Sequence, residues 1–123
     1  MVVVMPHVRF HGMVEAVGPD LLALRTVSGR VDVHLDAGVP LMLQIGERVR
    51  EGGARDTVSD GDFRNALLAR ERLGEVTLGC TLLDEPVDGK IVMGADHVCL
   101  VGRGGAETYF PFSCVSYVMP RRD

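Results

Sequence analysis

Short apolar runs separated by glycine-containing turns constrain the fold of this chain more than any other feature. In the run RVDVHL at residues 30–35, apolar and polar side chains alternate strictly. A period of two residues predicts a β-strand with one buried face and one solvated face. Similar runs recur along the chain, and many of its 15 glycines lie between them. Strands of about five residues cannot each bury a face alone, so we expect them to close into compact β-barrels.

The composition limits the class of protein. Hydrophobic residues make up 46% of the 123 residues and charged residues 24%, which predicts a globular chain. The apolar runs are too short to cross a bilayer, and the opening MVVVM lacks the basic flank of a signal peptide. The sequence therefore predicts a cytoplasmic protein without a membrane partner.

Cysteine usage and net charge argue against two further classes. Cys80, Cys99 and Cys114 form no CxxC pair, and their odd number predicts buried free thiols rather than a disulfide framework. The formal net charge of −4 opposes non-specific binding to nucleic acid, which needs a basic surface. Any nucleic-acid site would have to be a local basic patch.

A polar interval, GERVREGGARDTVSD, divides the chain into two halves. At the end of this interval Ser59 predicts a helix N-cap. Apolar residues at helical spacing then predict a helix near residues 60–72, and Gly74 ends it. The predicted organisation is a first domain at residues 1–50, a linker at 51–60 and a second domain at 61–123.

The two halves share a sequence pattern. Residues 12–24 read GMVEAVGPDLLAL, and residues 89–100 read GKIVMGADHVCL. In both, a strand leads to a Gly-x-Asp turn and then to another strand, although the second copy has one residue fewer between its glycines. This pattern predicts an internal structural repeat.

Four short motifs in the second half carry a family resemblance. They are FRNAL at 63–67, RER at 70–72, GKI at 89–91 and VSYVMP at 115–120. On these motifs, residues 62–122 resemble the Sm-like (Hfq/LSm) superfamily. The resemblance implies a mainly β chain with two small, strongly bent Sm-like β-barrels in tandem and one short α-helix opening the second.

The same resemblance implies a function. Sm-like proteins form rings by strand addition between barrels, so we expect a homo-oligomeric ring, with three two-barrel chains giving six barrels. Tyr117 to Met119 would supply the pairing edge. Single-stranded RNA is the implied partner, with no cofactor. The implied RNA-binding residues are Arg64, Asn65, Arg70, Arg72, Lys90, His97 and Tyr109.

A second interpretation is a protein-interaction or scaffolding barrel that has lost RNA binding. The base-reading residues of the family do not match here, because its helix glutamine falls near Asp60 and its Lys-His pair falls at Phe112-Ser113. The acidic net charge favours this alternative, whereas the family motifs favour RNA.

Other chemistry has weaker support in the sequence, and we expect neither an enzyme nor a metal site. His7 and His11 are four residues apart and His34 lies on another strand, but no cysteine or spaced carboxylate completes a metal pattern. The run GRGG at residues 102–105 lacks the ending of a phosphate-binding loop and predicts a hairpin turn.

Overall fold

The computed structural model describes residues 1–44 and 61–121, and within them the chain is mainly β, as predicted. The first half contributes β1 (Val2–Met5), β2 (Val8–His11), β3 (Met13–Val17), β4 (Leu21–Thr26), β5 (Gly29–His34) and β6 (Met42–Gln44). The second half contributes α1 (Phe63–Glu71), β7 (Glu75–Cys80), β8 (Val87–Met93), β9 (His97–Val101), β10 (Glu107–Pro111) and β11 (Val115–Pro120). The described residues also include the 3-10 turns η2 (Arg103–Gly105) and η3 (Phe112–Cys114).

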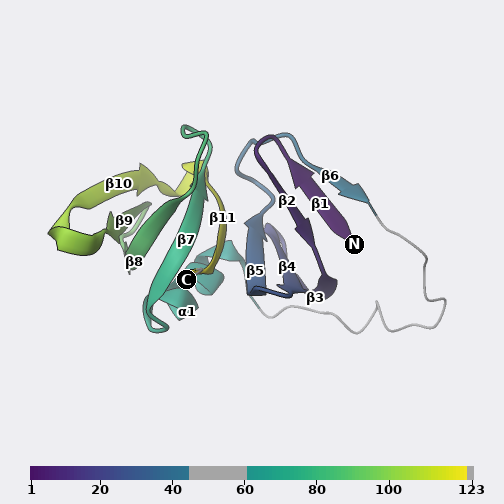
Figure 1. Cartoon of the computed structure of the whole chain (residues 1–123), viewed down its shortest axis with the longest axis horizontal. Helices are drawn as coiled ribbons and strands as arrows, with labels where there is room; N and C mark the ends of the chain where they lie inside the picture. The colour runs from purple at the N-terminus through teal and green to yellow at the C-terminus, as the bar shows by residue number, and fades with distance from the viewer. Residues whose placement is uncertain (45–60, 122–123) are drawn as a thin grey trace.

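The strands of the described residues form two antiparallel sheets (Figure 1). One has the order β2-β1-β6, and the other has the order β10-β9-β8-β7-β11-β5-β4-β3. Neither sheet closes on itself, so the expected pair of closed barrels is not confirmed. The predicted linker at 51–60 and the predicted cap Ser59 lie outside the described residues.

Glycines mark the points where a strand bends from one partner to the next. Gly12 separates β2 from β3, and a Cβ there would lie 2.4 Å from the carbonyl oxygen of Arg25. Gly89 lies where β8 turns from β7 to β9, and a Cβ there would lie 2.6 Å from the carbonyl oxygen of Val101. Both positions exclude a side chain because neighbouring backbone lies too close.

Both halves contain the same order of strand pairing. In the first half it is β6-β1-β2, continued through Gly12 as β3-β4-β5, and in the second it is β11-β7-β8-β9-β10. The register of β3 shifts between Val14 and Ala16, which leaves Glu15 as an extra residue in a bulge. This bulge accounts for the additional residue between the glycines of the first copy.

Equivalent turns connect the equivalent strands. The backbone N–H of Gly18 donates to Leu21 over 2.8 Å, and that of Gly94 donates to His97 over 2.9 Å. A second backbone hydrogen bond also recurs. The Leu35 N–H donates to the Asp20 carbonyl oxygen over 2.8 Å, and the Phe112 N–H donates to the Asp96 carbonyl oxygen over 3.0 Å. The sequence echo therefore coincides with matching backbone hydrogen bonds.

Helix α1 is shorter than the expected span of residues 60–72. Its N-cap is Asp62, whose carboxylate accepts the Asn65 N–H at 2.9 Å. Asp20 from the first half accepts the Phe63 N–H at 2.8 Å and so satisfies another free donor of the first turn. Within the described ranges, no helix is long and apolar enough to cross a membrane.

Each of two apolar clusters draws on both halves. The larger cluster packs Phe63 and Leu67 of α1 against the second-half strands and includes Leu21 from β4. The other consists of first-half residues together with Tyr117 and Met119 of β11. Burying one such large side chain stabilises the fold by about 1.5–3 kcal/mol, so separating the halves would expose costly apolar surface.

The predicted solvated face of residues 30–35 is wrong for two side chains. Asp32 and His34 are each only 2% exposed. Strand β5 lies inside the sheet between β4 and β11, and α1 also contacts it. Both faces of this strand are therefore covered at these positions.

Candidate functional site

The junction between the halves is a strand-to-strand contact. Strand β11 pairs antiparallel with β5, with Tyr117 opposite Val33 and Val118 opposite Asp32. On its other side β11 pairs with β7, so it has two neighbours within the chain. The segment that we expected to pair with another subunit, Tyr117 to Met119, is therefore already used inside the molecule.

Arg70 links α1 to this junction. It is 6% exposed, and its Nη2 and Nε lie 3.0 and 3.3 Å from Oδ2 of Asp32. Nη2 also donates to the carbonyl oxygen of Arg30. The Arg30 Nε donates to the other Asp32 oxygen over 2.8 Å. The prediction that Arg70 belongs to an exposed RNA-binding rim is wrong, because its guanidinium is buried and paired.

His34 makes a second set of contacts across the junction. Its Nδ1 lies 2.8 Å from the carbonyl oxygen of Val115, and its Nε2 lies 3.5 Å from Oδ2 of Asp20. Its ring stacks on Phe63 with centroids 4.4 Å apart and planes at 3°. Among the described side chains, no three or more His, Cys, Asp or Glu residues gather as a metal site. His34 instead holds the two halves and the helix together.

The remaining residues of the predicted RNA set separate into two groups. Lys90, His97 and Tyr109 lie on one face of the sheet, as the registers of β8, β9 and β10 place them. The rings of His97 and Tyr109 lie 5.7 Å apart. The helix covers the other face, where its buried residues pack against Ile91 and Leu100.

The helix residues of the set have other roles. Arg64 donates to the carbonyl oxygens of Gly94 and Ala95, both over 2.8 Å, and so secures the β8–β9 turn. Asn65 and Arg72 are exposed. The structure therefore does not bring the seven predicted residues into one surface.

The Tyr109 hydroxyl donates to the Glu107 carboxylate over 2.9 Å. This bond, followed by interaction with Cys99, raises the pKa of Tyr109 to about 12. We expect no phenolate absorbance step near pH 10, because burial also raises the pKa of Tyr117, the other tyrosine. Glu107→Gln should lower the pH at which Tyr109 ionises. Tyr109→Phe removes the absorbance step of this residue and so identifies it.

The sign of the linked effect on stability follows from this pKa. The folded state holds the Tyr109 proton more tightly than the unfolded state, so this contribution is complete below pH 10 and is lost between about pH 10 and pH 12. A Tyr109 step near pH 10 in the parent protein would contradict the assignment. The measurement is absorbance at 295 nm during alkaline titration.

Within the described residues four strands have a single neighbour: β2 and β3, which Gly12 joins directly, and the two separate edge strands β6 and β10. Strand β6 pairs only with β1, and β10 pairs only with β9. Met42 and Leu43 on β6 are 52% and 45% exposed. In the shared pairing order, β6 corresponds to β11 and β10 corresponds to β5. The two free edges are thus the equivalents of the two strands that pair at the internal junction.

Comparisons with protein-family models, curated proteins and solved structures found no match.

One signal for the junction was present in the sequence. Phe63, Ala66, Leu67 and Arg70 share one helical stripe, and three of these four are apolar. That spacing places Arg70 on the buried side of α1, whereas Arg72 falls outside the stripe. The partner Asp32 lies 38 residues away, and no local pattern indicates it.

Proposed function

We propose that this chain is a tandem Sm-like assembly module that joins further copies of itself, head to tail, into a closed ring. The single observation that carries the proposal is the strand pairing of β11 with β5 inside the chain. Because the two halves have the same pairing order, this junction is a template for a contact between chains. Three chains would supply six Sm-like units, as the resemblance implies.

The internal junction also specifies the register between chains. Met42 and Leu43 correspond to Tyr117 and Val118, because both pairs lie opposite equivalent residues of the first strand of their half. Phe110 and Tyr109 likewise correspond to Val33 and Asp32. The expected pairing therefore places Met42 opposite Phe110, and Leu43 opposite Tyr109, of the next chain.

A head-to-tail contact uses two different surfaces, so it produces a closed ring only when the rotation between neighbouring chains divides a full turn. Closure would remove both free edges, each of which otherwise offers unpaired backbone groups to other chains. Light scattering on the whole chain tests the proposal, with an expected mass of about three times the 13.3 kDa chain. A monomer at micromolar concentration would contradict it.

Binding of single-stranded RNA is a second candidate, and the observation that favours it is the His97–Tyr109 ring pair beside Lys90. Tyr109 is 61% exposed, so one ring face can stack on a base. The scaffolding alternative needs only the ring and no such contact. The two candidates differ in one measurable property, affinity for RNA.

Filter binding with oligo(U) and oligo(A) separates them. If RNA binds here, His97→Ala with Tyr109→Ala should lower the affinity for both oligo(U) and oligo(A) by at least about fivefold, because base stacking contributes about 1–3 kcal/mol per base. Lys90→Ala should reduce the salt slope by about one. Arg72→Ala, a charge change on the opposite face, is the control. If no RNA binds at about 50 mM salt, RNA binding is excluded and the scaffolding alternative remains.

A further inference from the structure

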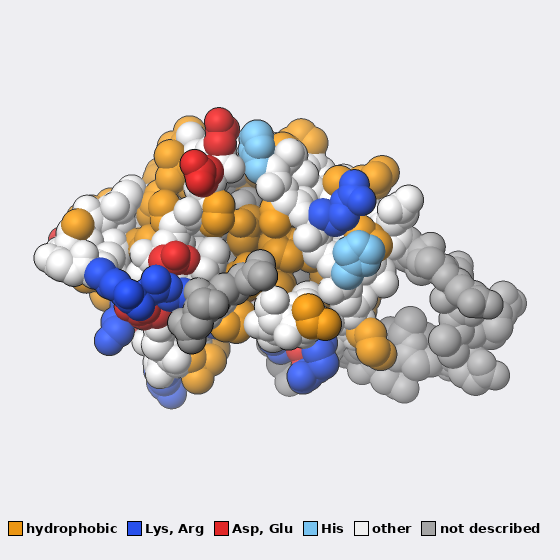
Figure 2. Space-filling view, in the orientation of Figure 1, with side chains coloured by type: hydrophobic (Ala, Val, Ile, Leu, Met, Phe, Trp, Pro, Cys, Tyr) orange, Lys and Arg blue, Asp and Glu red, His pale blue; other side chains and the backbone are white. Residues whose placement is uncertain are grey.

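A cavity of about 270 Å³ lies between the two halves of the chain. The β1–β2 turn and the β5–β6 connection line it from the first half, and the β7–β8 connection and β11 line it from the second. Figure 2 shows hydrophobic side chains across the middle of this face, with acidic and histidine side chains at one end. Assembly through β6 and β10 does not explain this cavity.

The wall of the cavity is largely apolar. Met5 is 6% exposed, Cys80 is 6% exposed and Tyr117 is 6% exposed. Gly79 adds no side chain, and a Cβ there would lie 2.2 Å from the Tyr117 ring. An apolar wall of this kind favours an occupant with an apolar body.

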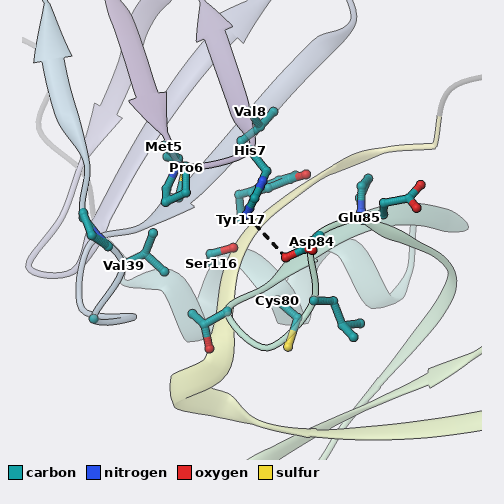
Figure 3. Close-up of a pocket in the computed structure, with 16 residues that line it drawn as sticks. Met5, Pro6, His7, Val8, Val39, Cys80, Asp84, Glu85, Ser116 and Tyr117 are labelled. Carbon is teal, nitrogen blue, oxygen red and sulfur yellow. Dashed lines mark ion pairs between the residues drawn. The ribbon is translucent and has the colours of Figure 1, made fainter.

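One polar group lies deep in this wall. Ser116 is 5% exposed, and it belongs to the residues that line the cavity. The register of β11 against β7 shifts between Val115 and Tyr117, so Ser116 is the extra residue of a β-bulge. Bulges redirect a side chain and are frequent beside binding sites. In Figure 3 the Ser116 side chain lies between Val39 and Asp84.

The mouth of the cavity is acidic. Asp84 and Glu85 are exposed there, and among the described lining residues neither Lys nor Arg is present. His7 and Asp84 face each other with 3.4 Å between Nε2 and Oδ1 (Figure 3). The Cys80 sulfur points away from this pair, so the three side chains do not form a nucleophilic set.

We propose that this cavity binds a small organic cation. Its apolar body would lie against Met5 and Tyr117, a hydroxyl would bond Ser116, and an ammonium group would meet Asp84 and Glu85. The cavity volume of about 270 Å³ lies just below the usual range for ligand pockets and suits a small molecule of about ten non-hydrogen atoms. The charge at the mouth selects a cation, and the buried hydroxyl selects a hydrogen-bonding group at the far end.

Three related probes test each contact separately by calorimetry on the whole chain. Tyramine carries both polar groups, 2-phenylethylamine lacks the hydroxyl, and 4-(2-hydroxyethyl)phenol lacks the charge. Tyramine should bind saturably and at least about tenfold more tightly than either analogue, which is the preference that one good polar contact provides.

Two variants assign the preferences. Asp84→Asn with Glu85→Gln should abolish the preference for tyramine over the uncharged analogue while keeping its preference over 2-phenylethylamine. Ser116→Ala should do the reverse. Asp96→Asn with Glu71→Gln removes the same charge from residues outside the cavity and should change neither preference. Absence of tyramine binding, or preferences that survive both cavity variants, would overturn the proposal.

Discussion

Arg70→Ala is expected to lower the free energy of unfolding by about 3 kcal/mol, because it leaves a buried carboxylate without its closest buried partner. Asp32 is 2% exposed and would retain only Arg30, whose side chain is 41% exposed. The substitution also removes the donor to the Arg30 carbonyl oxygen and the packing of the arginine stem. Urea unfolding followed by circular dichroism measures the change.

Arg72→Ala is the matched control for this prediction. It removes the same charge two residues away, but from an exposed position, so stability should change by less than about 0.5 kcal/mol. Asp32→Asn combined with Arg70→Met should cost less than Arg70→Ala, because neither buried charge is then left alone. Protein concentration must be held constant, since assembly adds stability. Equal stabilities for the Arg70 and Arg72 variants would show that the buried pair contributes nothing.

Met42→Lys with Leu43→Lys should convert the proposed ring into a monomer, a threefold fall in mass. Both side chains are about half exposed on β6, so the folded chain tolerates lysine there, whereas a charged edge resists strand addition. Opposite Phe110 and Tyr109 of the next chain, the two ammonium groups would lose water without gaining partners. Light scattering coupled to size exclusion measures the mass.

Val27→Lys is the control for assembly. Val27 is fully exposed in the β4–β5 turn and lies on neither free edge, so its variant should keep the mass of the parent. Circular dichroism should give the same strand content for all three proteins. If the double lysine variant keeps the parent mass, β6 is not the contact surface.

Sequence patterns predicted the local elements of this chain because local physics decides them. Alternating side chains gave the strands, the stripe from Phe63 to Arg70 gave the helix, and Gly74 ended it with φ at 109°. Gly12 and Gly89 occupy equivalent positions in the two copies of the repeated motif. At both positions the backbone lies too close to a neighbouring strand for a side chain. The mainly β class follows directly from these features.

Local patterns did not predict which surfaces of these elements are covered, because that depends on packing between distant parts of the chain. The period of a strand tells which side chains share a face, but not what lies against that face. Asp32 and His34 were therefore expected in water and are buried between β4, β11 and α1. Tyr117 was expected at an intermolecular edge and pairs with Val33 of the same chain.

The candidate sites depend on the same distinction. Arg70 has the sequence context of a basic rim but the structural context of a buried ion pair, because its partner comes from another half of the chain. Neighbouring residues were enough to predict the strands, the helix and their glycine turns, since each of these depends on a short stretch of chain. Only the fold decided which edges stay free and which polar groups meet across the junction, since those contacts join residues far apart in the chain.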